Sequence, residues 1–366
     1  GATLTITTIL AMQGNTKIVV ERGGKLVLNN ARIGNICGTW GGIQVWGNPT
    51  AQHSTNIHPT NPEPPFNYYL NANLNATEPG LVVLNQAIIE NTTDAAIKTA
   101  NDNVFDSNFW GGIIAAQNSQ FRNCKRGALL MPYSFENYSY FKNCLITSNV
   151  PTQAYSGVAS TRTNGILFDN CQFNYTGTNP PTYRMGIVTN NAAITVRNGC
   201  TFNNLNRGID IQNTNSYSAT IQIGTDNGNY ARNVFTNNNT GVYANTPFDL
   251  EIINNNFVGV STGWGIVVHG SSGYQIKGNS FENHYSGIIT LNTGKIATNN
   301  INCNVFTNNN VGMWALGDNQ SLHFDANNYQ SLLHDVVLTQ TVGGQEGFLA
   351  QQGTPILPVF NLFTDN

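Results

Sequence analysis

The chain has 366 residues, of which only 10% are charged, and its formal net charge is −3. Its Lys and Arg residues are scattered, which excludes the concentrated basic surface of a nucleic-acid-binding protein. The sequence contains no apolar run of 18 residues, so we expect no membrane-spanning segment. A chain of this length has room for two domains, but nothing marks a linker, and we predict a single domain over residues 1–366.

The first 49 residues contain short strand-like runs and read as opening coils. Such runs lie at Thr3–Ile6, Lys17–Val20 and Lys25–Leu28. Because Gly1 stands almost directly before the first of these runs, we interpret the chain as a trimmed mature product, in which a missing signal peptide means little.

Residues 50–80 differ in composition from the runs on either side. Proline cannot donate a backbone hydrogen bond to a strand ladder, so this segment is expected to be an excursion from the regular structure. The prolines in and beside it are Pro49, Pro59, Pro62, Pro64 and Pro65.

A recurring phrase begins after residue 100: a Phe near Asn residues is followed by a Gly and then an apolar residue. The first copies of this pattern are irregular: they pair Phe105 with Gly112, Phe121 with Gly127, Phe173 with Gly186 and Phe202 with Gly208. The copy from Phe173 to Gly186 contains an inserted loop from Asn174 to Tyr183.

Between residues 233 and 313 the phrase becomes regular. The steps from Phe to Phe are 22, 24 and 25 residues, and those from Gly to Gly are 24, 22 and 25, so both marks advance as one repeating unit. The four copies are Phe235 with Gly241, Phe257 with Gly265, Phe281 with Gly287, and Phe306 with Gly312.

One repeat holds short β-branched runs separated by Asn and Gly, which favours strands and tight turns. Such a unit cannot bury its apolar side alone, so successive units must stack as a parallel β-helix, with ten to eleven coils and regular coils over residues 81–330. We predict an internal stack of the Phe side chains. Asn side chains at the turns are expected to bond to the Asn of the adjacent coil.

After Gln330 the phrase stops, and residues 331–366 are predicted to form a cap or a covering segment. This part contains the apolar runs Leu332–Leu333, Val336–Leu338 and Ile356–Leu357.

The six cysteines are better explained by packing than by metal chemistry, because no Cys/His spacing is typical of a metal site. Cys124 and Cys144 each follow a Phe by three residues, whereas Cys171 and Cys200 each precede one by two. We therefore expect each pair to occupy equivalent positions in neighbouring coils. Stacked buried thiols are the first interpretation and disulfides the alternative.

The runs Lys17–Leu26 and Cys37–Asn48, the latter containing Trp-Gly-Gly-Ile-Gln-Val-Trp-Gly, carry a resemblance to a known family. They resemble the opening of right-handed, pectate-lyase-like parallel β-helix domains in large secreted proteins of Bacteroidota. The resemblance implies export by the type IX secretion machinery and a cell-surface or extracellular location. Most members of that family have no assigned activity, so it implies little about chemistry.

A β-helix hydrolase needs two or three carboxylates that converge across neighbouring coils, and a lyase needs a basic residue near the substrate carboxylate. The candidates for such a role are Arg207, Asp210 and His269. No carboxylate stands at the position of Asp210 in the neighbouring repeats, so these residues are more simply interpreted as surface groups.

A second candidate site is an apolar and aromatic stripe. Tyr243, Val267, Ile289 and Trp314 follow the Gly of successive repeats and should lie in a row, with Trp46 at a similar position in an opening coil. Such a patch indicates a glycan-binding face, a protein interface, or a surface covered by residues 332–359.

The run Asp226–Asn229 loosely resembles a Ca²⁺-binding loop but lacks the acidic residue that would close the site, which favours a simple turn. The sequence predicts a secreted or cell-surface non-catalytic module, structural or adhesive, that binds polysaccharide or another surface protein. The alternatives are a polysaccharide lyase or glycoside hydrolase and a self-assembling fibre subunit.

Overall fold

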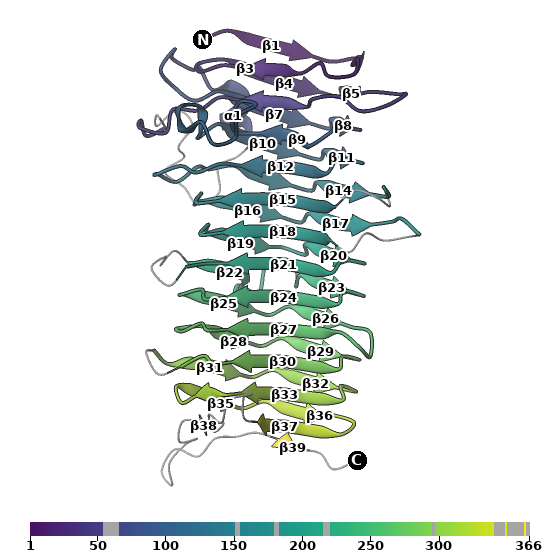
Figure 1. Ribbon diagram of the computed structural model, residues 1–366, viewed down its shortest axis with the longest axis vertical. Helices are drawn as coiled ribbons and strands as arrows, with labels where there is room; N and C mark the ends of the chain where they lie inside the picture. Colours follow the sequence, from purple (N-terminus) through teal and green to yellow (C-terminus); the bar gives the residue numbers. More distant parts are fainter. Residues whose placement is uncertain are drawn as a thin grey trace. The chain divides into compact units, whose positions relative to one another are not determined.

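The computed structural model describes residues 1–53, 66–150, 154–178, 183–214, 220–294 and 297–339, together with two short strands near the C-terminus. The protein is an all-β parallel solenoid of about twelve turns (Figure 1). The chain forms two compact units, residues 1–194 and 195–366.

In unit 1, three strands in each turn contribute to three parallel sheets, A1, B1 and C1. Each strand pairs with the strand three positions later in the chain, as a solenoid requires. Sheet A1 contains β1 (Thr3–Ile6), β4 (Lys25–Asn29), β7 (Leu81–Asn85), β10 (Ile113–Gln117), β13 (Tyr140–Lys142) and β16 (Ile166–Asp169). Sheet B1 contains β2 (Ile9–Ala11), β5 (Arg32–Gly34), β8 (Ile88–Glu90), β11 (Gln120–Arg122), β14 (Leu145–Ser148) and β17 (Gln172–Tyr175). Sheet C1 contains β3 (Ile18–Val20), β6 (Ile43–Val45), β9 (Ala95–Lys98), β12 (Arg126–Leu130), β15 (Tyr155–Thr161) and β18 (Arg184–Asn190).

Unit 2 repeats this arrangement in sheets A2, B2 and C2. Sheet A2 contains β19 (Ile194–Arg197), β22 (Ile221–Gly224), β25 (Leu250–Ile253), β28 (Gln275–Lys277), β31 (Asn299–Asn302) and β35 (Leu322–Asp325). Sheet B2 contains β20 (Thr201–Asn203), β23 (Val234–Thr236), β26 (Asn256–Val258), β29 (Ser280–Glu282), β32 (Val305–Thr307), β36 (Asn328–Gln330) and β39 (Leu362–Phe363). Sheet C2 contains β21 (Arg207–Gln212), β24 (Thr240–Asn245), β27 (Trp264–His269), β30 (Ser286–Leu291), β33 (Val311–Leu316) and β37 (His334–Thr339). A separate pair joins β34 (Asp318–Asn319) to β38 (Phe348–Leu349).

The parallel β-helix prediction is confirmed, but the predicted ten to eleven coils are too few. The count relied on Phe as the mark of a coil, and several turns of unit 1 carry an aliphatic side chain at the same inward position of sheet B1. The register aligns Leu10, Ile33, Ile89, Phe121, Ile146 and Phe173 in one column. Turns without the Phe mark were therefore missed.

The predicted Phe stack is confirmed in unit 2. The rings of Phe202, Phe235, Phe257, Phe281 and Phe306 lie face to face, with centroids 4.6 to 5.0 Å apart. Tyr329 continues the stack at 4.7 Å from Phe306. These separations match the rise of one solenoid turn, so one ring per turn fills the core.

The Asn ladder is also confirmed, at the turn between sheets A2 and B2. Asn233, Asn255, Asn279, Asn304 and Asn327 are buried, and each of the first four donates its side-chain N–H to the side-chain oxygen of the next, at 2.9 to 3.1 Å. The residue directly before the ladder residue takes a positive φ in four turns, where it is Asn254, Gly278, Cys303 or Ala326. Buried amides that bond across turns satisfy backbone groups that would otherwise be unpaired at this corner.

Phe105 is wrongly paired with Gly112 in the sequence interpretation. It is 84% exposed, on the loop that contains the 3-10 helix η1 (Ser107–Phe109), and Gly112 leads into sheet A1 rather than C1. A Phe beside Asn residues is therefore not a sufficient mark of a core position.

Of the Pro-rich segment the structure describes residues 50–53 and 66–80, and these contain a helix and no strand, while residues 54–65 lie outside the described part. Helix α1 (Asn67–Asn71) buries Tyr69 against the outer side of sheet A1, beside Val27, Val83 and Tyr140. Lys25 donates hydrogen bonds to the carbonyl oxygens of Leu70 and Ala72, at 3.0 and 2.8 Å, which fastens the segment to β4.

All six cysteines are free thiols, with four buried and two exposed, Cys37 and Cys303. The expected equivalence of Cys124 and Cys144 is wrong, because Cys124 follows a strand of sheet B1 whereas Cys144 precedes one. The expected equivalence of Cys171 and Cys200 is confirmed, because each directly precedes a strand, β17 or β20. Cys144 and Cys171 hold equivalent places before β14 and β17, and Cys200 stands likewise before β20 in unit 2. Each buried thiol lies near backbone carbonyl oxygens, as in the contact of Cys144 with Ala116 at 3.5 Å.

Candidate functional site

The outer side of sheet C2 brings the predicted stripe into one column. The register pairs Tyr243 with Val267, Val267 with Ile289, and Ile289 with Trp314. Successive strands of a parallel ladder stand about 4.8 Å apart, so these four side chains form a continuous row along the direction of stacking.

The middle of this row is more enclosed than the sequence suggests. Val267 is 8% exposed and Ile289 is 7% exposed, so neither offers much surface to a ligand. The open aromatic surface comes instead from Trp264, 41% exposed, and Tyr285, 39% exposed. They lie on neighbouring turns, where the N–H of Tyr285 donates to the carbonyl oxygen of Gly263 at 2.8 Å.

The sequence interpretation missed Trp264 and Tyr285 because it considered only the residues after each Gly. Trp264 directly precedes Gly265, and Tyr285 stands two residues before Gly287. Both residues could have been predicted by looking for an aromatic residue at the start of a C2 strand or directly before it, after the turn from sheet B2.

Trp314 extends this aromatic surface to a third turn. Its ring lies 6.3 Å from that of Tyr285, and its indole N–H donates to the hydroxyl of Thr339 at 2.9 Å. Thr339 ends β37, which extends sheet C2 rather than lying over it. Most of the apolar segment that was expected to cover the stripe, residues 332–359, lies outside the described residues, namely 340–347 and 350–359.

Arg207 and Asp210 form one compact cluster at the start of sheet C2. The guanidinium lies 2.9 Å from the carboxylate, and the Gln212 side chain donates to the same oxygen at 2.7 Å. The Arg207 guanidinium carbon also lies 3.8 Å from the centre of the Tyr243 ring, which is a cation–π contact. One face of Tyr243 is thus occupied by Arg207, so this ring is not an open platform.

His269 is not brought into contact with Asp210. Its register partner is Asn245, whose side chain donates to the side-chain amide oxygen of Gln212 at 3.1 Å, and Gln212 in turn donates to Asp210. Asp210 is buried, and its register partner in the next turn is Tyr243 rather than a second acid. Among the described contacts of Asp210 there is an ion pair and an amide hydrogen bond but no second carboxylate, whereas glycoside hydrolysis commonly uses two.

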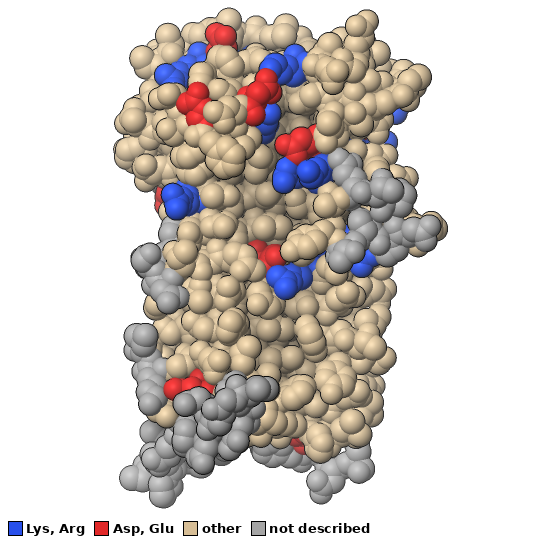
Figure 2. Space-filling model, viewed as in Figure 1, with Lys and Arg blue, Asp and Glu red and all other residues tan. Residues whose placement is uncertain are grey.

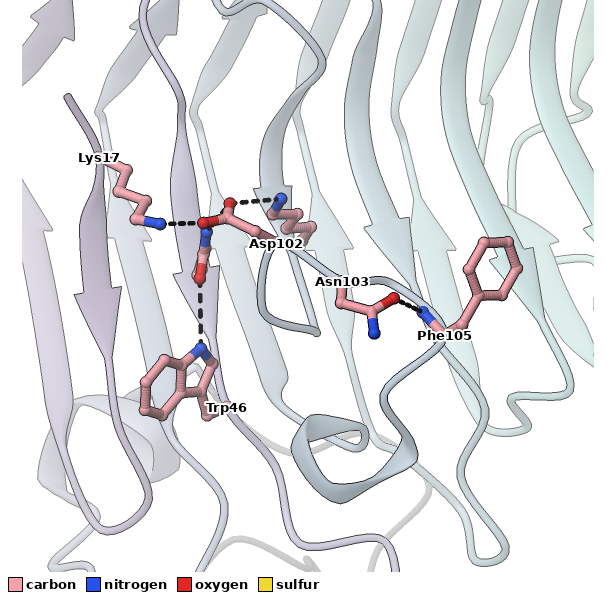
Figure 3. Close-up of polar contacts among 7 residues, drawn as sticks. Lys17, Trp46, Asp102, Asn103 and Phe105 are labelled. Carbon is pink, nitrogen blue, oxygen red and sulfur yellow. Dashed lines mark hydrogen bonds and ion pairs between the residues drawn. The ribbon is translucent and has the colours of Figure 1, made fainter. Parts of the chain in front are cut away.

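Trp46, the remaining stripe candidate, belongs to unit 1 and has different surroundings. Asp102 is paired with both Lys17 and Lys98. Figure 3 shows the contact between Lys17 and Asp102, with Trp46 nearby. Gln44 donates to Asp102 at 2.5 Å, and the indole of Trp46 donates to Gln44 at 3.3 Å. The hydrogen bond from Lys17, aided by Lys98, holds the pKa of the Asp102 carboxyl below its usual value.

This cluster fastens the loop that carries Phe105 and Phe109. The ring of Trp46 packs edge-on against Phe109, with centroids 4.6 Å apart. Asn103 accepts a hydrogen bond from the N–H of Phe105 at 3.2 Å, as Figure 3 also shows. The contacts of Trp46 are therefore those of a packing residue that holds a loop.

The Trp-rich run of the opening coils is explained by packing. Trp40 is fully buried and donates its indole N–H to the carbonyl oxygen of Glu90 at 2.9 Å. A Cβ at Gly47 would stand 2.0 Å from the carbonyl oxygen of Trp110, so the backbone can pass there only without a side chain.

Charged side chains are unevenly distributed over the surface. In Figure 2 they gather over the N-terminal turns of unit 1, and the visible surface of unit 2 carries few of them. Strands β24, β27, β30 and β33 contain no Lys, Arg, Asp or Glu at all.

Within the described ranges, no cluster of three or more His, Cys, Asp or Glu side chains could hold a metal ion. In the loop that resembles a Ca²⁺-binding motif, Asp226 is paired with Lys277 at 2.7 Å. No helix among the described residues is long and apolar enough to cross a membrane.

The sequence matches no protein-family profile and no curated protein. Among solved structures, it is similar to PfbA, a surface adhesin of Streptococcus pneumoniae, with 10% identity and a TM-score of 0.41, covering 94% of this chain and 84% of that one. An alginate lyase from Paenibacillus is similar at 11% identity and a TM-score of 0.28, covering 95% and 99% of the two chains. A capsular polysaccharide depolymerase, the tailspike protein gp49 of the Acinetobacter baumannii bacteriophage Fri1, gives 11% identity and a TM-score of 0.25, covering 90% and 57%.

Proposed function

We propose that this protein is a secreted or cell-surface, non-catalytic β-helix module that binds glycan through the outer side of sheet C2. The observation that carries the proposal is the pair of open rings of Trp264 and Tyr285 on neighbouring turns of a rigid sheet. Exposed aromatic rings attract the C–H groups on the apolar face of a sugar, because the ring face is electron-rich. Rings on a rigid sheet also lose little conformational entropy on binding.

Location and export belong to the same proposal. The resemblance of residues 17–26 and 37–48 to exported Bacteroidota β-helix domains supports a surface or extracellular location, with the type IX secretion machinery as the export partner. Fractionation of producing cells, with detection of the chain in the medium and on the cell surface, tests this part. Retention inside the cell would contradict it.

The binding proposal is tested with a glycan array and a polysaccharide screen that reads both retention and the release of unsaturated or reducing ends. Binding without cleavage is the expected result. Cleavage would overturn the non-catalytic assignment and direct attention to Arg207 and Asp210. A chain that neither binds nor cleaves would instead favour a purely structural scaffold.

A further inference from the structure

The aromatic face formed by Trp264, Tyr285 and Trp314 lacks fixed charge. The four strands on which it is built, β24, β27, β30 and β33, have the sequences TGVYAN, WGIVVH, SGIITL and VGMWAL. The ionisable side chains in these four strands are Tyr243 and His269. His269 ends β27, whereas Trp264 begins it. A ligand lying over these rings would therefore meet no permanent cation or anion of these strands.

Two strands adjoin these four, β37 beside β33 and β21 beside β24. On β37 the one residue with a permanent charge is Asp335, an anion, whose carboxylate accepts from the N–H of Ser331 at 3.2 Å. The charged groups on β21 are paired with each other. Arg207 lies 2.9 Å from Asp210 and also stacks on Tyr243, while Asp210 accepts a second hydrogen bond from Gln212. An anionic ligand at Arg207 would compete with Asp210 and Tyr243 for the guanidinium. Drawing Arg207 away would leave the buried Asp210 carboxylate without its cation, which is costly.

An acidic polysaccharide carries a carboxylate or sulfate on many of its sugar units. Laid over Trp264, Tyr285 and Trp314, those anions would lose water without gaining a cation, whereas a neutral sugar loses only weakly held water from its apolar face. The charge distribution of this face therefore discriminates between the two classes of glycan.

We infer that the ligand of the Trp264–Tyr285–Trp314 face is an uncharged polysaccharide that lies across successive turns of unit 2. The three rings stand on three consecutive turns, so the ligand is a chain that spans several sugar units rather than a single terminal sugar. This inference rests on the proposed glycan-binding function and adds the chemical class of the ligand.

The test compares neutral polysaccharides (laminarin, galactomannan and a soluble cellulose-derived glucan) with alginate and polygalacturonate, by affinity electrophoresis and titration calorimetry across a NaCl series. At least one neutral glycan is expected to bind, with an affinity that does not change with salt, because exposed charges contribute nothing to it. Trp264→Ala and Tyr285→Ala are each expected to weaken this binding about tenfold, the range of one lost aromatic contact. Phe105→Ala, which removes an exposed ring from unit 1, is the matched control and should bind as the parent does.

Each outcome decides a different point. Salt-sensitive binding of alginate or polygalacturonate, with none of the neutral glycans retained, would overturn the inference and leave the proposed function standing. Neutral binding that survives both Trp264→Ala and Tyr285→Ala, with unchanged thermal unfolding, would show that the ligand lies elsewhere. Absence of binding to either class would contradict the proposed function itself.

Discussion

Gly241 lies directly against the ring of Phe257, which belongs to the next turn of the solenoid. A Cβ at position 241 would stand 2.6 Å from Cδ1 of Phe257 and 2.6 Å from the carbonyl oxygen of Gly265. The same relationship joins Gly208 to Phe235, Gly265 to Phe281, and Gly287 to Phe306. The repeated Phe and Gly of the sequence therefore reflect a contact between turns. Each Gly leaves space for the Phe ring of the following repeat, not for the Phe ring of the same repeat.

The first prediction concerns this contact. Gly241→Ala should destabilise the protein by about 1–3 kcal/mol, because both neighbours of the added methyl are held by the stacks above and below. Urea unfolding of the full chain measures this change in the free energy of unfolding. Gly228→Ala is the control, because a Cβ at Gly228 would meet nothing within 4 Å, and it should leave the free energy of unfolding nearly unchanged. Equal stability of the two variants would contradict the packing argument.

Much of the fold follows from the sequence because the solenoid repeats its contacts. The Phe stack and the Asn ladder could be predicted from spacing alone, since a residue at a fixed place in the repeat must meet its own counterpart one turn away. Trp264 and Tyr285 could not be found this way, because they lie at the entrance to the strand, where the repeats differ in length and residue type. The exposure of Phe105 could not be predicted from the repeat either, since it depends on a loop held by Asp102.

The Asn ladder gives a second prediction, at Asn279. Its side chain accepts from the N–H of Asn255 at 2.8 Å and donates to the carbonyl oxygen of Ile252 at 2.8 Å. Asn279→Ala would leave these buried groups unpaired and should cost about 3 kcal/mol. Thermal and urea unfolding measure the loss. Asn239→Ala, which removes an exposed side chain from a turn of the same unit, should change stability by no more than about 0.5 kcal/mol. A similar small effect at Asn279 would show that the ladder is dispensable.

His284 predicts a dependence of stability on pH. The imidazole ring of His284 is buried, and burial lowers the pKa of His284 from 6.5 to about 4. The unfolded chain therefore binds this proton more readily than the folded one between pH 6.5 and about 4. The free energy of unfolding is therefore unaffected by this group above pH 6.5. It falls by roughly 3 kcal/mol in all as the pH drops from 6.5 to about 4.

A variant at this position tests the dependence. Asn309 holds the corresponding place in the next turn and donates its side-chain N–H to the carbonyl oxygen of Phe281 at 3.0 Å. His284→Asn should therefore fold and lose most of the fall in stability between pH 6.5 and 4. His323→Gln, at an exposed histidine, should keep the parent's pH profile. An unchanged slope in His284→Asn would assign the acid sensitivity to another group.

The cysteines give a prediction that a thiol titration can check. Cys37 and Cys303 are exposed and should react quickly with a disulfide reagent, whereas the other four should react only after unfolding. Burial raises the pKa of the Cys124 thiol to about 11, which removes the reactive thiolate as well as access to it. We expect two fast thiols in the native protein and six in denaturant. A denatured count below six would instead reveal the disulfide alternative.

The last prediction separates a structural Asp210 from a catalytic one. Asp210→Asn keeps the shape of the side chain but removes the charge that holds Arg207, 2.9 Å away, so Arg207 should also leave the ring of Tyr243. A hydrogen bond between charged groups contributes about 1.5–3 kcal/mol, and the free energy of unfolding should fall by about that amount. Arg207→Met should cost more, about 3–5 kcal/mol, because it leaves the buried Asp210 carboxylate without its cation. The double variant should cost less than the sum, because both single changes break the same pair. If Asp210→Asn abolished release of sugar ends from a polysaccharide while leaving unfolding unchanged, Asp210 would be catalytic and the ion pair only its resting arrangement.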